Sequence, residues 1–132
     1  MRIMLDTNIL VSIIFFPSEI TRNFAQRVGF GNRIVLCDYV LEELRLVAKR
    51  KFPSKQSIIE RFFYELPFEL VYTPKQLDSR EFPKVRDSQD FPILAMAMIE
   101  NIDILITGDK DLLVVESEYP EILTMNEFMQ KY

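Results

Sequence analysis

The feature that most limits how this chain can fold is a series of short apolar runs, each separated from the next by a segment too long for a hairpin turn. The runs lie at residues 2–6, 33–37, 68–73, 102–107 and 121–124. Strands joined by helices rather than by tight turns pair in parallel and are covered on both faces. The 132 residues are therefore predicted to form one α/β domain, residues 1–132, with a central parallel sheet of about five strands.

The segments between these runs carry the start and stop signals of helices. Pro17 stops the first of them, and Ser18 and Asp38 are N-cap residue types for two others. Residues 74–86 are polar, contain proline and are predicted to be irregular. Predicted helices cover residues 8–16, 18–30, 38–51, 54–66 and 88–100, and another follows the last strand.

Two of the predicted strands are followed at once by aspartates. The run "RIML" ends at Asp6, and "ILIT" is followed by Gly108, Asp109 and, two residues later, Asp111. In an open parallel sheet the carboxyl ends of the strands lie at one edge, where ligands bind. Folding is therefore expected to bring Asp6 and Asp109 into one crevice. The alternative is that each aspartate only caps a helix or a turn.

The helix predicted at 38–51 contains two adjacent glutamates that are expected to differ. Glu42 has Arg45 three residues away, which predicts a salt bridge and a solvent-facing side chain. The helical neighbours of Glu43 are all apolar or aromatic, and a carboxylate on such a stripe is costly unless a positive charge compensates it. A metal ion is the favoured compensation. The alternatives are that Glu43 reaches solvent from the edge of the stripe or pairs with a distant Arg or Lys.

Asp87 and Asp90 stand at the entrance of the helix predicted at 88–100, which is otherwise apolar nearly all round. Pro92 fits only in the first turn of this helix. Aspartate at a helix N-terminus accepts hydrogen bonds from free N–H groups, so capping is the ordinary explanation of Asp90 taken alone, and the functional case for Asp87 is weaker. The combination of Asp6, Glu43, Asp90 and Asp109 on one rim still indicates a metal site.

The absence of histidine excludes more chemistry than any other feature of the composition. It removes Ser-His-Asp and Cys-His nucleophiles, histidine-based ribonuclease chemistry and His-ligated transition metals. The single cysteine, Cys37, allows neither an internal disulfide nor a zinc cage and fits a reducing cytoplasm. No apolar stretch is long enough to span a membrane, and the first residues do not resemble a signal peptide. The net charge of −4, taken alone, argues against a nucleic-acid partner.

Four segments together resemble the acidic motifs of the PIN domain family: "MLDTN", "LEEL", "RDSQDFPILAMA" and "ILITGDKDLL". The resemblance extends from residue 1 to about residue 128, and the order and spacing resemble the branch described as toxin components of toxin–antitoxin systems. It implies a three-layer α/β/α Rossmann-like PIN fold and a ribonuclease that depends on Mg²⁺ or Mn²⁺. Pro92 departs from the family pattern, where a small residue or Leu is common, which puts the direction of Asp90 in question.

The resemblance also implies roles for individual residues. Asn8 and Thr107 match positions whose polar groups orient the site, while Asp111 and, more weakly, Asp87 match further acidic positions and are predicted as additional metal ligands. Such a site would hold one or two ions through carboxylate oxygens and activate water for in-line attack, which leaves a 5′-phosphate and a 3′-hydroxyl. The acids that correspond to the catalytic, metal-binding set are Asp6, Glu43, Asp90 and Asp109.

Partners are also implied, namely an RNA substrate and a cognate antitoxin protein. Without the six clustered acids, 14 acids remain against 16 bases, so a metal-loaded site would not oppose phosphate. A homodimer or antitoxin contact through apolar residues of the first helix is a further possibility, with core packing as the alternative. The residues expected to contact RNA, unless they are simply solvated, are Arg45, Lys49, Arg50 and Lys110. The residues considered for the homodimer or antitoxin contact are Ile13, Ile14, Phe15 and Phe16.

Two other functions compete with the nuclease. A metal-dependent phosphotransferase on a related α/β fold would usually carry a second acid two residues after the first, and Asn8 stands there instead. A module that has lost catalysis and binds RNA or a protein on the same rim is the other candidate. The intact set of acids argues against it.

Overall fold

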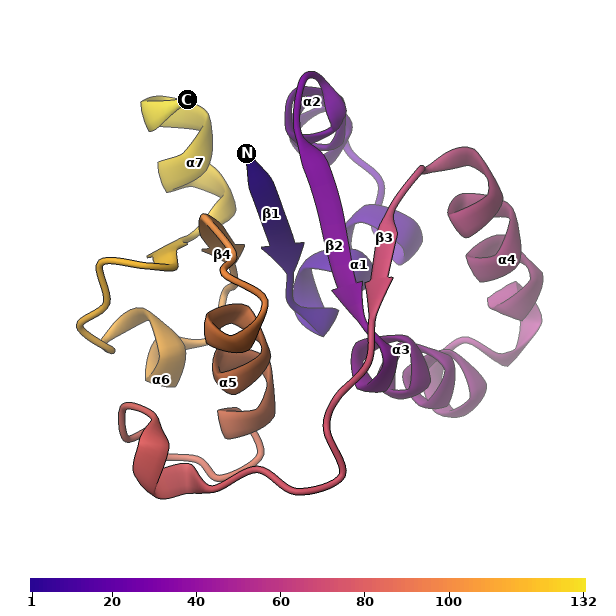
Figure 1. Cartoon of the computed structure of the whole chain (residues 1–132). Coiled ribbons are helices and arrows are strands. Elements are labelled where there is room, and N and C mark those ends of the chain that lie inside the picture. Colours follow the sequence, from indigo (N-terminus) through magenta and orange to yellow (C-terminus); the bar gives the residue numbers. More distant parts are fainter.

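The computed structural model describes residues 1–132 and contains a five-stranded parallel sheet flanked by helices (Figure 1). The strands pair in the order β3-β2-β1-β4-β5. Each strand lies within one of the predicted apolar runs, so the predicted class and sheet are confirmed. The strands are β1 (Arg2–Leu5), β2 (Arg33–Cys37), β3 (Glu69–Val71), β4 (Ile104–Ile106) and β5 (Glu121–Leu123).

The helices follow the predicted segments closely, with one addition. The short helix α6 after β4 was not predicted, and α5 begins at Phe91 rather than at residue 88 because residues 87–90 form a turn. Ser18 caps α2 in a capping box with Thr21. The helices are α1 (Thr7–Phe15), α2 (Glu19–Gly29), α3 (Asp38–Lys51), α4 (Gln56–Glu65), α5 (Phe91–Ile99), α6 (Lys110–Leu113) and α7 (Met125–Lys131), with short 3-10 helices at Pro53–Lys55 and Ser79–Glu81.

Asp38 is the first residue of α3 rather than its N-cap, although its Oδ1 accepts a hydrogen bond from the Tyr39 N–H of the first turn at 2.8 Å. Cys37 occupies the N-cap position and makes no side-chain capping bond. The Asp38 carboxylate also accepts hydrogen bonds from the backbone N–H and the hydroxyl of Thr73, at 3.0 and 2.7 Å. These bonds hold the pKa of Asp38 below its ordinary value against the opposing effect of burial, and they tie the start of α3 to the chain just beyond β3.

The strand order reverses direction at β1, and this gives the protein its three layers. From β1 the chain moves through β2 to β3, with α1–α4 in the connections, and then crosses to β4 and β5, with α5 and α6 in the connections. Because such crossovers are right-handed, the two groups of helices lie on opposite faces of the sheet. The reversal falls between β1 and β4, the position at which open α/β sheets bind ligands.

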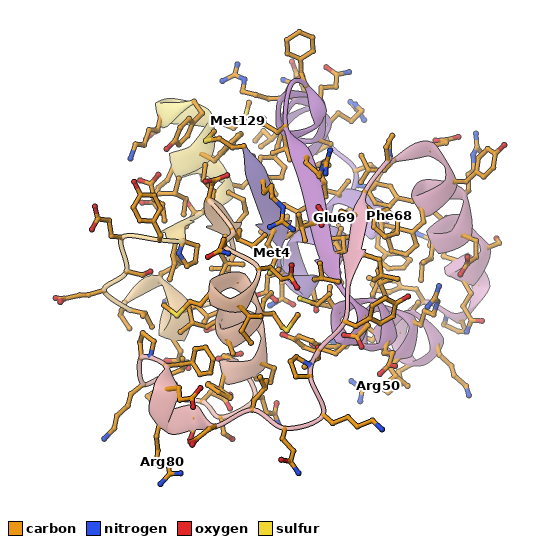
Figure 2. The ribbon with its side chains drawn as sticks, viewed as in Figure 1. Met4, Arg50, Phe68, Glu69, Arg80 and Met129 are labelled. Atoms are coloured by element: carbon orange, nitrogen blue, oxygen red, sulfur yellow. The ribbon has the colours of Figure 1, made fainter.

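The core is formed by strands that are apolar on both faces. Ile3, Met4 and Leu5 are almost completely buried, and Met4 lies near the middle of the side chains (Figure 2). Parallel strands covered on both sides have this continuous apolar character. The Phe24 and Phe128 rings meet edge to face at 5.7 Å and join α2 to α7. None of the helices combines the length and the apolar character that a membrane span requires.

The apolar residues at the end of α1 divide between core and surface. Ile14 and Phe15 are buried and Ile13 is partly buried, so these residues serve the core rather than a partner. Phe16 is 59% exposed. Of the four residues considered for a partner contact, only Phe16 therefore offers a substantial surface.

Candidate metal centre

Asp6 follows β1 directly and is positioned by both the sheet and α1. Its backbone N–H donates to the carbonyl of Ile106 at 3.0 Å, which fixes it against the end of β4. Its Oδ1 accepts a hydrogen bond from the Thr7 N–H at 2.7 Å, as the N-cap of α1, and its Oδ2 accepts one from the Thr107 hydroxyl at 2.7 Å. Burial raises the pKa of Asp6, and the charge of Asp109 adds to the effect.

Thr107 couples Asp6 to Asp109. It follows β4 and is fully buried. While its hydroxyl donates to Asp6, its oxygen accepts a hydrogen bond from the backbone N–H of Asp109 at 3.0 Å. Asp109 in turn caps α6, because its Oδ1 accepts from the Asp111 N–H at 2.9 Å. One side chain thus sets the relative positions of two acids, in keeping with the orienting role expected for Thr107.

Asp90 occupies the N-cap position of α5, but its side chain makes no capping hydrogen bond. The capping explanation is therefore wrong for this residue. Its Oδ2 is buried and has no hydrogen-bond partner. Burial, together with the adjacent Asp109 carboxylate and the charges of Asp87 and Asp6, raises the pKa of Asp90 to about 7. A buried carboxylate oxygen without a donor is costly unless it gains a proton or a cation.

Glu43 does not lie on the core-facing side of α3, which corrects the prediction. The buried residues of this helix are Val40, Leu41, Leu44 and Ala48, whereas Glu43 is exposed and its neighbour Leu46 is 60% exposed. The alternative position at the edge of the stripe is the correct one. Partial burial and the charge of Asp6 nevertheless raise the pKa of Glu43, so the two carboxylates are close enough to act on each other.

The expected Glu42–Arg45 salt bridge is absent. Glu42 is exposed, as predicted, but Arg45 pairs with Glu60 of α4 at 3.3 Å. The spacing of three residues permits a Glu42–Arg45 pair. However, α4 packs beside α3 and places the Glu60 carboxylate close to Arg45, which binds it instead. Arg45 is thereby partly neutralised at a position where an RNA contact is expected.

Asp111 has a cationic partner that the sequence did not indicate. The Nε and Nη2 atoms of Arg86 donate to its two carboxylate oxygens at 2.8 and 3.1 Å, and this pairing lowers the pKa of Asp111. Carboxylate oxygens of Asp87, Asp90 and Asp111 lie within 4.8 Å of one another. Asp87 also accepts a hydrogen bond from the Gln89 N–H at 2.9 Å, within the turn that precedes α5.

The other predicted site residues lie at varying distances from this group in the fold. Asn8 is exposed on α1 and its side chain makes no hydrogen bond, so the structure does not join it to the acids. Lys110 is the exposed first residue of α6, directly after Asp109. Arg45 and Lys49 line a hollow of about 420 Å³ between α3 and α4. Arg50, labelled in Figure 2, is exposed near the end of α3.

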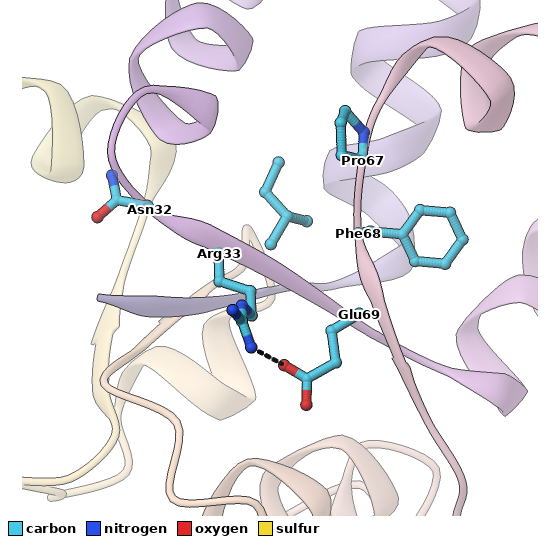
Figure 3. Close-up of a pocket in the computed structure, with 6 residues that line it drawn as sticks. Asn32, Arg33, Pro67, Phe68 and Glu69 are labelled. Atoms are coloured by element: carbon cyan, nitrogen blue, oxygen red, sulfur yellow. Dashed lines mark ion pairs between the residues drawn. The ribbon is translucent and has the colours of Figure 1, made fainter.

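A different hollow, of about 340 Å³, opens at the opposite edge of the sheet, beside the first residues of β2 and β3 (Figure 3). Its acid, Glu69, lies 3.9 Å from the Arg33 guanidinium and 2.8 Å from that of Arg2. This carboxylate is therefore neutralised by basic side chains and is not a candidate metal ligand.

The acids at the carboxyl edge carry the ligand type of a hard divalent cation, although the oxygens already within 4.8 Å of one another are those of Asp87, Asp90 and Asp111 rather than those of the predicted set. None of Asp6, Glu43, Asp90 and Asp109 takes part in an ion pair with Lys or Arg. All of them offer oxygen ligands, which Mg²⁺ and Mn²⁺ prefer, and the unpartnered Oδ2 of Asp90 is the atom most in need of a cation.

Comparisons with known proteins agree with this description. The sequence profile described as the PIN domain matches residues 2–111. A chain in the crystal structure of VapBC2 from Rickettsia felis, bound to a DNA fragment from their promoter, superposes with a TM-score of 0.72 and 22% sequence identity, over 93% of this chain and 97% of that chain. No curated protein matches the sequence significantly. The structural likeness supports the three-layer α/β/α fold.

Proposed function

The chain belongs to the PIN domain family, and from this premise we propose that it is a ribonuclease that depends on Mg²⁺ or Mn²⁺. The observation that carries the proposal is the uncompensated group of carboxylates at the carboxyl edge of the sheet, above all the buried, unpartnered Oδ2 of Asp90. Structural ion pairs would explain acids at this edge only if basic partners were present, and four of these acids have none.

The residues that would hold the ion are Asp6, Glu43, Asp90 and Asp109. When bound, a divalent ion of this kind supplies positive charge that activates water and stabilises the negative charge that develops on a phosphodiester. The chain's own contribution is preorganisation. Thr107 holds the Asp6 carboxylate and the Asp109 backbone in fixed relative positions, which favours cation binding.

The charges of the site favour cation binding before RNA binding. In the absence of a cation, the charges of Asp6, Asp90 and Asp109 act on one another and would repel an RNA phosphate. Cation binding removes this repulsion. Lys110, beside Asp109, and the basic residues Arg45, Lys49 and Arg50 of α3 could then hold the RNA backbone.

A role as the toxin of a toxin–antitoxin pair is the biological part of the proposal. It rests on the likeness of the four motifs to that branch of the family and on the fold shared with a chain of the VapBC2 complex. The partner would be an antitoxin protein that covers the acidic edge until it is removed. Co-purification with the product of an adjacent gene is the corresponding test.

The enzymatic proposal is tested by incubating fluorescently labelled RNA with Mn²⁺ and the native protein, Asp109→Asn or Glu69→Gln. We expect cleavage by the native protein and by Glu69→Gln, with 5′-phosphate and 3′-hydroxyl ends. Asp109→Asn should be slower by more than about 100-fold, since even outer partners of metal ligands contribute about 10- to 100-fold. RNA binding without cleavage by the native protein would instead favour a non-catalytic binding module.

A further inference from the structure

Arg86 is the one basic side chain paired with an acid of the candidate centre, and the proposed chemistry gives it no task. It lies in the irregular segment between β3 and α5, where its side chain is 85% exposed. Its fork-shaped guanidinium contacts both oxygens of Asp111, which is 19% exposed, at 2.8 and 3.1 Å. This bidentate geometry is the strong form of an arginine–carboxylate pair.

The pair lies within the acidic group rather than beside it. Asp111 offers a carboxylate oxygen within 4.8 Å of oxygens from Asp87 and Asp90. The hydrogen bond to Asp111 raises the pKa of Arg86, and the charges of Asp111, Asp87 and Asp109 add to the effect, as expected when these acids lie on one side of an exposed guanidinium. The positively charged guanidinium of Arg86 therefore occupies carboxylate oxygens of Asp111 that a divalent ion could otherwise bind.

Arg80 shows what an ordinary arginine of the same segment does. It is 89% exposed and pairs with Asp78, only two residues away, within a local 3-10 turn. Arg86, by contrast, reaches a residue 25 positions further along the chain and joins the segment to α6. The long-range pair cannot be explained by local turn geometry.

From these contacts we propose that Arg86 competes with the divalent cation for Asp111, so that the native centre holds its ion without this carboxylate. The inference rests on the proposed metal-dependent function and adds a residue that limits how tightly the cation binds. Because the guanidinium is exposed, salt screens the pair and reduces the energetic advantage of its bidentate geometry, so a divalent cation can compete with it. Removing Arg86 both frees a ligand and removes a positive charge that repels the ion.

The test is the affinity for Mn²⁺, measured by calorimetric titration without RNA, in native protein, Arg86→Ala, Asp111→Asn and the double variant. We expect Arg86→Ala to bind Mn²⁺ about fivefold more tightly than the native protein at low salt, as the loss of an exposed ion pair allows. Asp111→Asn should stay within about twofold of native, and the double variant should lose most of the gain.

Matched variants separate this competition from general charge effects. Arg80→Ala removes an equal charge from the same segment and should leave the Mn²⁺ affinity unchanged. Arg86→Lys keeps the charge but not the bidentate fork and should fall between native and Arg86→Ala. Circular dichroism of each variant establishes that it is folded.

The possible outcomes are distinguishable. Native protein that binds no Mn²⁺ at millimolar concentration would overturn the proposed function together with this inference. Native binding that Arg86→Ala leaves unchanged would overturn the inference alone. A gain in Arg86→Ala that persists undiminished in the double variant would also overturn it, because the effect would then not pass through Asp111.

Discussion

Acidic side chains gather at both edges of the sheet, but their surroundings differ. At the amino edge, Arg2 reaches Glu69 at 2.8 Å and Glu100 at 3.6 Å, and Arg33 lies 3.9 Å from Glu69. At the carboxyl edge, Asp6, Glu43 and Asp90 have no basic partner, and burial together with neighbouring carboxylates raises their pKa values.

Under the proposed function, the difference separates acids that support the fold from acids that would bind a cation. Paired charges at the amino edge satisfy one another when the chain folds. At the carboxyl edge Arg86 compensates Asp111, but the charges of Asp6, Glu43 and Asp90 have no basic partner, which destabilises the folded protein unless a cation binds. Regions where a protein gives up stability in this way are commonly its functional sites. The following experiments test the contrast, in order of decreasing expected effect.

Mn²⁺ should raise the melting temperature of the native protein much more than that of Asp6→Asn. At about 100 times its dissociation constant, a ligand adds about 2.7 kcal/mol, which corresponds to several degrees in a domain of this size. Thermal melts with increasing Mn²⁺ provide the measurement, and Glu69→Gln, from the amino edge, should shift like the native protein. Equal shifts in native protein and Asp6→Asn would argue against a centre built on Asp6.

Thr107→Val should lower the affinity for Mn²⁺ by about 10- to 100-fold, the usual effect of losing a group that orients metal ligands. Valine keeps the volume of the buried side chain but removes the hydroxyl that joins Asp6 to the Asp109 backbone. Calorimetric titration measures the change. Thr73→Val is a matched control, because it removes a threonine–aspartate hydrogen bond to Asp38 and should leave Mn²⁺ binding unchanged.

The metal-free protein should lose stability as the pH rises from about 5 to 8. The pKa of Asp90 is raised from 3.8 to about 7 by folding, so the folded state holds the proton more tightly. Its contribution is complete below about pH 4 and disappears as the pH rises through about 7. We expect a change on the order of 1 kcal/mol, because partial exposure reduces the effect.

Urea denaturation in EDTA at several pH values measures this dependence, and Asp90→Asn should flatten it. Asp111 contributes with the opposite sign, since Arg86 lowers its pKa and its contribution is lost only as the pH falls into the acidic range. Greater stability of the metal-free native protein at pH 8 than at pH 5 would contradict the prediction.

Arg2→Gln should have the smallest effect, a loss of about 1 kcal/mol in the free energy of unfolding. The guanidinium bonds to Glu69 and to the Glu100 carbonyl, but these groups are only partly buried. Urea denaturation measures the loss, and Mn²⁺ affinity should not change. A fall in Mn²⁺ affinity would show that the two edges are coupled and would weaken the distinction between them.

The sheet and part of the site could be predicted from the sequence because both depend on short-range patterns. An apolar run of four to six residues identifies a buried parallel strand, and the residue after it must lie at the carboxyl edge. The expected proximity of Asp6 and Asp109 follows from this rule. The hydrogen bonds that join Asp6 and Asp109 through Thr107 also involve only residues that directly follow these two strands.

The sequence-based predictions that were wrong or missing concern features that only tertiary packing determines. Glu43 is one position away from the buried stripe of α3, and a helical pattern does not define its edge to within one residue. Asp90 is a good cap by residue type, yet its carboxylate is left without a donor. The Arg86–Asp111 pair depends on the path of an irregular segment, for which no periodicity exists.

Asp6 and Asp109 each accept a hydrogen bond as the N-cap of a helix, at Thr7 and Asp111. Asparagine preserves such a cap, whereas alanine or valine removes it at a cost of about 1 kcal/mol. In a selection for inactive alleles, Asn at either position should therefore accumulate as intact protein. Alleles with aliphatic residues at the same positions should be found at lower abundance, because unfolded chains are removed by cellular proteases.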